Sequence, residues 1–207
     1  MKIYDYKGFP NPARVRIALA EKNMTGRVDF VSIDVPAGAH KKPDFLAKNP
    51  SGAVPVLELD DGTTISECTA ITEYIDNLDG QPTLTGRTPK ERAVIHMMQR
   101  RAEVGLLDAV GAYFHHATPG MGPKIELYQN PGWGEHSRDR AQAGMRYFDQ
   151  VLGERPYLAG DSFSMADITA FAGLAFADFA GVDVPDELTN LTAWRARVGD
   201  RASVADA

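Results

Sequence analysis

The pattern of predicted secondary structure changes near residue 80, and this change limits the possible folds most strongly. Before it, short runs of alternating apolar residues are separated by runs with helical spacing, and after it no strand stands out. Alternation with a period of two predicts a strand, whereas apolar residues three or four positions apart predict a helix. The 207 residues are enough for one or two domains. We therefore expect an α+β protein in which a mixed first part precedes an all-helical second part.

The first part opens with a strand, a helix and a second strand. Residues 2–6 and Val28 to Ile33 are the predicted strands, and Pro12 to Lys22 is the predicted helix between them. Proline is well suited to the first turn of a helix. Two strands joined through a helix should be parallel and connected by a right-handed crossover.

A loop rich in glycine and proline then leads to a hairpin and a further helix. The order predicted for the first part is β-α-β-α-β-β-α over about 78 residues. Pro55 cannot donate to a sheet ladder, so we expect it at the beginning of its strand. The remaining predicted elements are one or two helical turns at Pro43 to Lys48, a strand at Val54 to Leu59, its partner at Thr63 to Ile65, and a helix at Thr69 to Leu78.

The second part is predicted to be entirely helical. We place the first domain at residues 1–80, a linker at 81–87 and the second domain at 88–207. A segment rich in glycine and proline, Tyr113 to Trp133, is expected to be a loop or a broken region. The predicted helices are Thr88 to His116, Gly134 to Leu152, Ser164 to Phe179, which is apolar nearly all round, and Glu187 to Arg201.

Charge and cysteine content exclude several classes of protein. The formal net charge is -6 and no long basic stripe offsets it, which argues against a nucleic-acid partner. Cys68 is the single cysteine and cannot form an internal disulfide, as is usual in a reducing compartment. The first six residues lack a signal-peptide core, and the longest near-apolar run, Ile168 to Ala177, is about half the length of a membrane span. We expect a cytoplasmic protein that does not enter the membrane.

Three sequence motifs, which follow one another along the chain, resemble those of the glutathione S-transferase superfamily, particularly bacterial members near the theta and nu classes. The resemblance extends from residue 2 to about residue 203. It implies a thioredoxin-like βαβαββα domain followed by an all-α domain, glutathione as co-substrate, no metal, and a homodimer. The motifs are Pro10 to Leu19, then Asn49 to Leu57 with Glu67 to Ile71 beyond it, and Ser164 to Ile168.

The chemistry that this resemblance implies depends on ionising the glutathione thiol. A free thiol titrates near about 8.5, and lowering its pKa by about two units requires roughly 2.7 kcal/mol of preference for the thiolate. A helix N-terminus and one good donor can together supply this. The resemblance assigns the activating position to the loop before the first helix, where many relatives carry Ser or Thr two residues before Asn11. Here that position is Phe9, so we predict that the side-chain amide of Asn11 is the donor.

Two alternatives remain for this loop. Asn11 could simply cap the first helix, which is a common role for asparagine. Tyr6 could supply a hydroxyl instead, because other classes use a tyrosine near the end of the first strand.

The remaining glutathione contacts follow from the same resemblance. Val54 and Pro55 match the cis-proline turn, where the Val54 backbone would pair with the peptide backbone of glutathione. Glu67 and Cys68 begin the third helix, whose N–H groups suit the γ-glutamyl carboxylate, while Glu67 would pair with the ammonium. His40 would contact the glycine carboxylate, unless it belongs only to a solvated basic cluster. Cys68 could be a tolerated small residue or a redox thiol of low pKa.

The predicted activity is conjugation of the glutathione thiolate to an electrophilic, largely apolar small molecule. The pocket for that molecule is predicted to be lined by Phe9, Tyr113 and His116. One alternative is a glutathione-dependent disulfide or peroxide reductase, and another is a non-catalytic glutathione-binding or interaction protein with the same fold. The Ser164-x-x-Asp167 motif is expected to be a capping box with a structural role.

Overall fold

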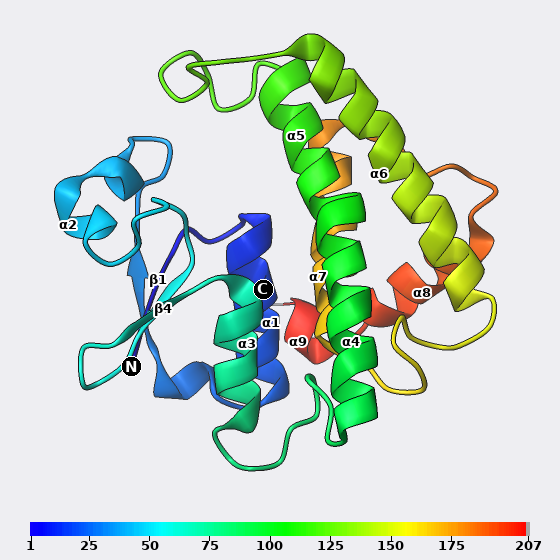
Figure 1. The fold of residues 1–207 in the computed structure, drawn as a ribbon, viewed down its shortest axis with the longest axis horizontal. Coiled ribbons are helices and arrows are strands. Elements are labelled where there is room, and N and C mark those ends of the chain that lie inside the picture. The colour runs from blue at the N-terminus through cyan, green and yellow to red at the C-terminus, as the bar shows by residue number, and fades with distance from the viewer. Residues whose placement is uncertain (206–207) are drawn as a thin grey trace.

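The computed structural model describes residues 1–205, which contain one mixed sheet of four strands in the order β2-β1-β3-β4 (Figure 1). As predicted, β1 and β2 are parallel, with Ile3 opposite Phe30. β3 runs antiparallel to β1 and forms a hairpin with β4. Pro55 lies just before β3, as its missing N–H requires. The strands are β1 Lys2–Asp5, β2 Asp29–Ser32, β3 Val56–Glu58 and β4 Thr64–Ser66.

The helices of the first part are α1 Pro10–Glu21, α2 Pro43–Leu46 and α3 Cys68–Asn77. In Figure 1, α1 and α3 lie on the side of the sheet that faces the helical part, whereas α2 lies away from it. A core of apolar side chains from β1, β3, α1 and α3 joins the sheet to these two helices. Its fully buried members include Ile3, Val15, Leu19, Leu57, Ile71 and Ile75. The predicted thioredoxin-like βαβαββα order is confirmed.

The second part is helical, as predicted, but its first helix is not uniform. The segment expected to be one helix from Thr88 to His116 contains a five-residue π-helical turn, Glu103–Leu107. α6 begins at Pro131, three residues before the predicted start, because the Asn130 side chain caps it by accepting from the Trp133 N–H. The helices are α4 Pro89–Ala102, α5 Asp108–Ala117, α6 Pro131–Leu152, α7 Met165–Ala180, α8 Thr189–Gly199 and α9 Ala202–Ala205.

α7 is the buried centre of the helical part, as its sequence predicts. Ser164 caps it in a reciprocal capping box with Asp167. The fully buried Asp167 carboxylate also accepts from the Leu158 N–H and the Trp194 indole N–H. Asp167 therefore ties the start of α7 to the preceding loop and to α8.

The two parts are joined along α1 and through the segment that follows α3. The buried Asp76 carboxylate on α3 accepts hydrogen bonds from the backbone N–H groups of Thr83, Leu84 and Thr85. At the far end of the chain, Arg201 forms two hydrogen bonds with Glu21 on α1, at 2.9 and 2.7 Å. These contacts hold the helical part against the α1 and α3 side of the sheet domain. No helix within residues 1–205 has the length and apolar character of a membrane span.

Candidate active site

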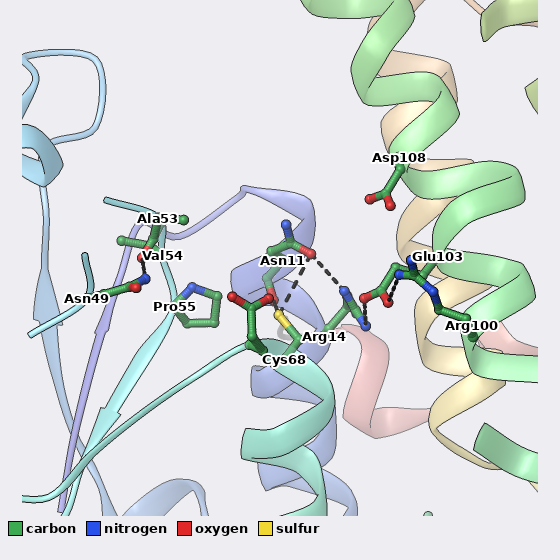
Figure 2. A pocket seen from close by; sticks show the side chains of 11 residues that line it. Asn11, Arg14, Asn49, Ala53, Val54, Pro55, Cys68, Arg100, Glu103 and Asp108 are labelled. Carbon is green, nitrogen blue, oxygen red and sulfur yellow. Dashed lines mark hydrogen bonds and ion pairs between the residues drawn. The ribbon is translucent and has the colours of Figure 1, made fainter. Parts of the chain in front are cut away.

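A cavity of about 190 Å³ lies where the sheet domain meets the helical part (Figure 2). One wall comes from the start of α1, the loop before β3 and the start of α3. The other wall comes from the end of α4, the π-helical turn and the start of α5. The lining residues are Asn11, Arg14, Asn49, Ala53, Val54, Pro55, Glu67, Cys68, Arg100, Glu103 and Asp108.

Asn11 is the second residue of α1, and its side chain does not cap the helix. The N-cap residue is Phe9, which forms no side-chain capping bond. The Asn11 Oδ1 atom instead accepts a hydrogen bond of 2.9 Å from Arg14 Nη1. A guanidinium has only donors, so the amide oxygen must face Arg14 and the Nδ2 group must point away from it. Asn11 is exposed at the cavity and therefore presents an N–H donor there.

Arg14 connects Asn11 to the helical part. Its side chain is only 5% exposed, and its Nη2 atom lies 3.0 Å from Glu103 Oε1. The other Glu103 oxygen lies 3.2 Å from Arg100 Nη1, which comes from the last turn of α4. Two guanidinium groups thus share one carboxylate across the seam between the domains (Figure 2).

The π-helical turn explains why Glu103 and Asp108 both face the cavity. In a regular α-helix, residues five positions apart point about 140° away from each other. Here the Asp108 N–H donates to the Glu103 carbonyl, which is the five-residue spacing of a π-helix and brings the two side chains to one face. Burial raises the pKa of Asp108, and the nearby Glu103 carboxylate raises it further. The sequence prediction missed both residues because it treated this segment as a regular helix.

The loop before β3 presents its backbone to the cavity. The Val54-Pro55 peptide bond is cis, and both residues line the cavity. The buried Asn49 side chain braces the loop by donating from Nδ2 to the Ala53 carbonyl at 2.8 Å and accepting from Ser51.

Glu67 and Cys68 occupy the start of α3 at the cavity, but Cys68 is not an activated thiol. Glu67 is the exposed N-cap residue and has a positive φ of 69°. The Cys68 Sγ atom donates to the Asn11 carbonyl oxygen at 3.4 Å. Burial raises the pKa of Cys68 to about 11. The hypothesis of a low-pKa redox thiol is therefore wrong, because burial outweighs the effect of the helix N-terminus.

The structure does not bring His40 into this cavity. His40 lies in the 3-10 turn Ala39–Lys41, is 6% exposed, and its buried Nδ1 atom has no hydrogen-bond partner within residues 1–205. Burial lowers the pKa of His40, and the positive charge of Lys41 lowers it further.

The three residues predicted for the second-substrate pocket are also absent from the lining of this cavity. Phe9 packs edge-on against Tyr6, with ring centroids 4.8 Å apart. Tyr113 packs against the helical core and lies beneath Arg138 of α6. The His116 Nδ1 atom accepts a hydrogen bond from the Asn130 N–H. Tyr113 and His116 therefore contact α6 and the loop before it.

A thioredoxin-like domain followed by an all-helical domain, with a polar cavity at their junction, is the architecture of the glutathione S-transferases. Two family models match the chain. Residues 10–78 match "Glutathione S-transferase, N-terminal domain" and residues 131–197 match "Glutathione S-transferase, C-terminal domain". The chain belongs to the glutathione S-transferase family.

Individual relatives agree with this assignment over nearly the whole chain. Glutathione S-transferase 2 of Saccharomyces cerevisiae is 66% identical over 204 residues, covering 99% of this chain and 88% of the relative. The crystal structure of yeast Gtt2 superposes with a TM-score of 0.98 at 66% identity, covering 100% and 99% of the two chains. A glutathione S-transferase domain-containing protein of Marinobacter aquaeolei has a TM-score of 0.97 at 61% identity, covering 99% and 100%. The activity is accordingly that of a glutathione S-transferase, with glutathione as co-substrate.

Proposed function

We propose that the cavity holds the glutathione thiol beside Asn11 Nδ2, which donates to the sulfur and favours its thiolate form. The thiolate then attacks an electrophilic carbon of a largely apolar small molecule. A C–S bond forms, and a leaving group departs or an activated double bond takes up the electron pair. The observation that carries this proposal is the bond from Arg14 to Asn11 Oδ1, since it leaves the amide N–H groups free at the cavity.

The rest of glutathione would follow the cavity wall of the sheet domain. The Val54 backbone would pair with the cysteinyl backbone of glutathione, beside Pro55. The N–H groups at the start of α3, including that of Cys68, would bind the γ-glutamyl carboxylate. Glu67 would bind the ammonium. We keep His40, which lies in the 3-10 turn outside the lining of the cavity, as a proposed contact of the glycine carboxylate.

Replacing Asn11 by Ala tests this proposal. Turnover should fall strongly, by about tenfold or more, with a modest loss of glutathione affinity, because the lost bond favours only the thiolate. The pKa of bound glutathione, followed by thiolate absorbance, should rise. The matched comparison is Tyr6→Phe, which removes only the rival hydroxyl. If Asn11→Ala leaves turnover unchanged and Tyr6→Phe lowers it, the tyrosine and not the asparagine activates the thiol.

A glutathione-dependent reductase is the second candidate. The residue before α1 is Phe9, so Asn11 has no neighbouring hydroxyl. This departure favours the reductase. With Cys68 buried, the attacking thiolate would have to be that of glutathione itself. Faster turnover of a mixed disulfide than of an aryl halide would support the reductase, and the opposite order would support conjugation.

We also propose that the protein is a cytoplasmic homodimer related to the bacterial theta and nu classes. Its motifs support the class, and the single buried cysteine is compatible with a reducing compartment. Met97 on α4 and Leu78 after α3 are each 44% exposed, which is consistent with a covered surface in a dimer. Sedimentation equilibrium at micromolar concentration should give twice the chain mass.

A further inference from the structure

The buried guanidinium of Arg14 bridges two elements that no local sequence pattern connects. One of its nitrogens donates to the Asn11 amide oxygen on α1, and the other pairs with Glu103 on the π-helical turn of the helical part (Figure 2). A guanidinium is a rigid planar fork, so fixing one nitrogen constrains the direction of the other.

We propose that Arg14 is a positioning residue through which the helical domain sets the orientation of the Asn11 amide. The inference rests on the proposed role of Asn11 as the thiol donor. Without Arg14, the amide oxygen would keep only the weak contact from Cys68 Sγ at 3.7 Å. The amide could then rotate or exchange its oxygen and nitrogen, and an acceptor would face the thiolate in part of the population. The charge-assisted hydrogen bond of 2.9 Å from Arg14 removes that freedom.

Burial makes this contact more than a surface ion pair. Arg14 is 5% exposed at its side chain and Glu103 is 21% exposed, so solvent screens their interaction weakly. Glu103 compensates the Arg14 charge, which leaves directional hydrogen bonding as the main effect of Arg14 on the cavity. A lysine at this position could keep the charge but could not hold both partners in the same geometry.

The first test measures kcat/KM below neutral pH and the thiol pKa of bound glutathione for Arg14→Gln, Asn11→Ala and the double variant. Arg14→Gln should lower kcat/KM by about tenfold and raise the thiol pKa. Glutathione affinity should change by less than about threefold. In the Asn11→Ala background, the Arg14 substitution should add less than about a twofold loss.

Arg16→Gln is the matched control. Arg16 lies two residues further along α1 and also forms a buried ion pair, with its Nη2 atom 2.7 Å from Asp5, but it is not among the cavity residues. Its loss should destabilise the fold without raising the thiol pKa. Arg14→Lys gives a further variant if Arg14→Gln folds poorly. Lysine keeps the positive charge but not the geometry, so this variant should also show a raised thiol pKa.

The outcomes separate this inference from the proposed function. Equal losses from Arg14→Gln in the wild-type and Asn11→Ala backgrounds would overturn positioning while leaving Asn11 as the donor. Full rescue by Arg14→Lys would assign the effect to charge and would also overturn positioning. An Asn11→Ala enzyme with unchanged turnover and thiol pKa would overturn the role of Asn11 itself, and the inference with it.

Discussion

At the scale of single residues, Glu67 holds a backbone conformation that glycine would adopt more easily. Its φ is 69° and its ψ is 120°, at the first cavity position of α3. Backbone strain of this kind costs on the order of 1–3 kcal/mol and is found most often at functional sites. The strain is consistent with a side chain that is retained for its carboxylate.

We therefore expect Glu67→Gly to be more stable than the wild type by about 1 kcal/mol, since relief of strain exceeds the entropy cost of glycine. Glutathione affinity should fall in the same variant. Urea unfolding and glutathione titration measure the two effects. Glu67→Gln is the control, because it keeps the strain and removes only the charge. Equal stability of the glycine and glutamine variants would show that the backbone is not strained.

Cys68 should be chemically inert in the folded protein. Burial raises its pKa to about 11, so little thiolate exists at neutral pH. Alkylation by iodoacetamide at pH 7.5 should be at least about tenfold slower than for free cysteine and should become fast in denaturant. Rapid alkylation of the native protein would contradict the burial argument.

The candidate site was predictable on one wall only. The sequence motifs named Asn11, Val54, Pro55, Glu67 and Cys68, and the structure gathers all five at one cavity. Arg14, Glu103 and Asp108 were missed. Arg14 looks like an ordinary charged residue of an amphipathic helix, and its partner Glu103 lies in the second part of the chain.

At the scale of elements, the capping box of α7 is expected to contribute strongly to stability. The Asp167 carboxylate accepts from the Ser164 N–H and Oγ, the Leu158 N–H and the Trp194 indole N–H at 3.0–3.1 Å. Asp167→Asn should cost about 3 kcal/mol, because the amide cannot accept from all four donors in the buried site. Ser164→Ala should cost only about 1 kcal/mol. Chemical unfolding of both variants checks this order, and a smaller loss for Asp167→Asn would contradict it.

Hydrophobic periodicity predicted every strand of the sheet and the main helices, because one face of each element packs against a core. It did not predict the π-helical turn. The sequence of that turn, Glu-Val-Gly-Leu-Leu, contains one isolated glycine, which a helical pattern tolerates. One extra residue in a turn alters side-chain direction without ending the helix. Residue boundaries of the two domains, 1–80 and 88–207, stay predictions.

At the scale of the whole molecule, the seam between the two parts is polar at both ends. Arg14 and Glu103 join the parts beside the cavity, and Glu21 and Arg201 join them at the far end of α1. Long-range pairs of this kind leave no local signal in the sequence, since Glu21 and Arg201 are 180 positions apart. We expect the seam to weaken in acid, because the Glu21–Arg201 pair needs an ionised carboxylate.

Glu21 should be one source of this sensitivity. Burial raises the pKa of Glu21, but hydrogen bonds from Arg201 and Ser203 lower it more, so its net pKa lies below the ordinary value. A carboxyl group whose pKa is lower in the folded state stabilises the fold at any pH above its unfolded pKa, which is about 4.3 for glutamate. This contribution is lost as the pH falls through the folded pKa. Acid should therefore weaken the pairing of α1 with Arg201.

Glu21→Gln isolates this contribution. At pH 7 the variant should be less stable than the wild type by about 2 kcal/mol, because a half-buried Arg201 loses its charged partner. The difference should shrink as the pH is lowered below about 4.3, since the wild-type carboxylate is then protonated as well. Urea unfolding across that pH range measures this difference.

Glu154→Gln serves as the control, because Glu154 is exposed and forms no ion pair within residues 1–205. A stability difference between Glu21→Gln and wild type that stays constant with pH would mean that the Glu21 carboxylate does not stabilise the seam through its charge.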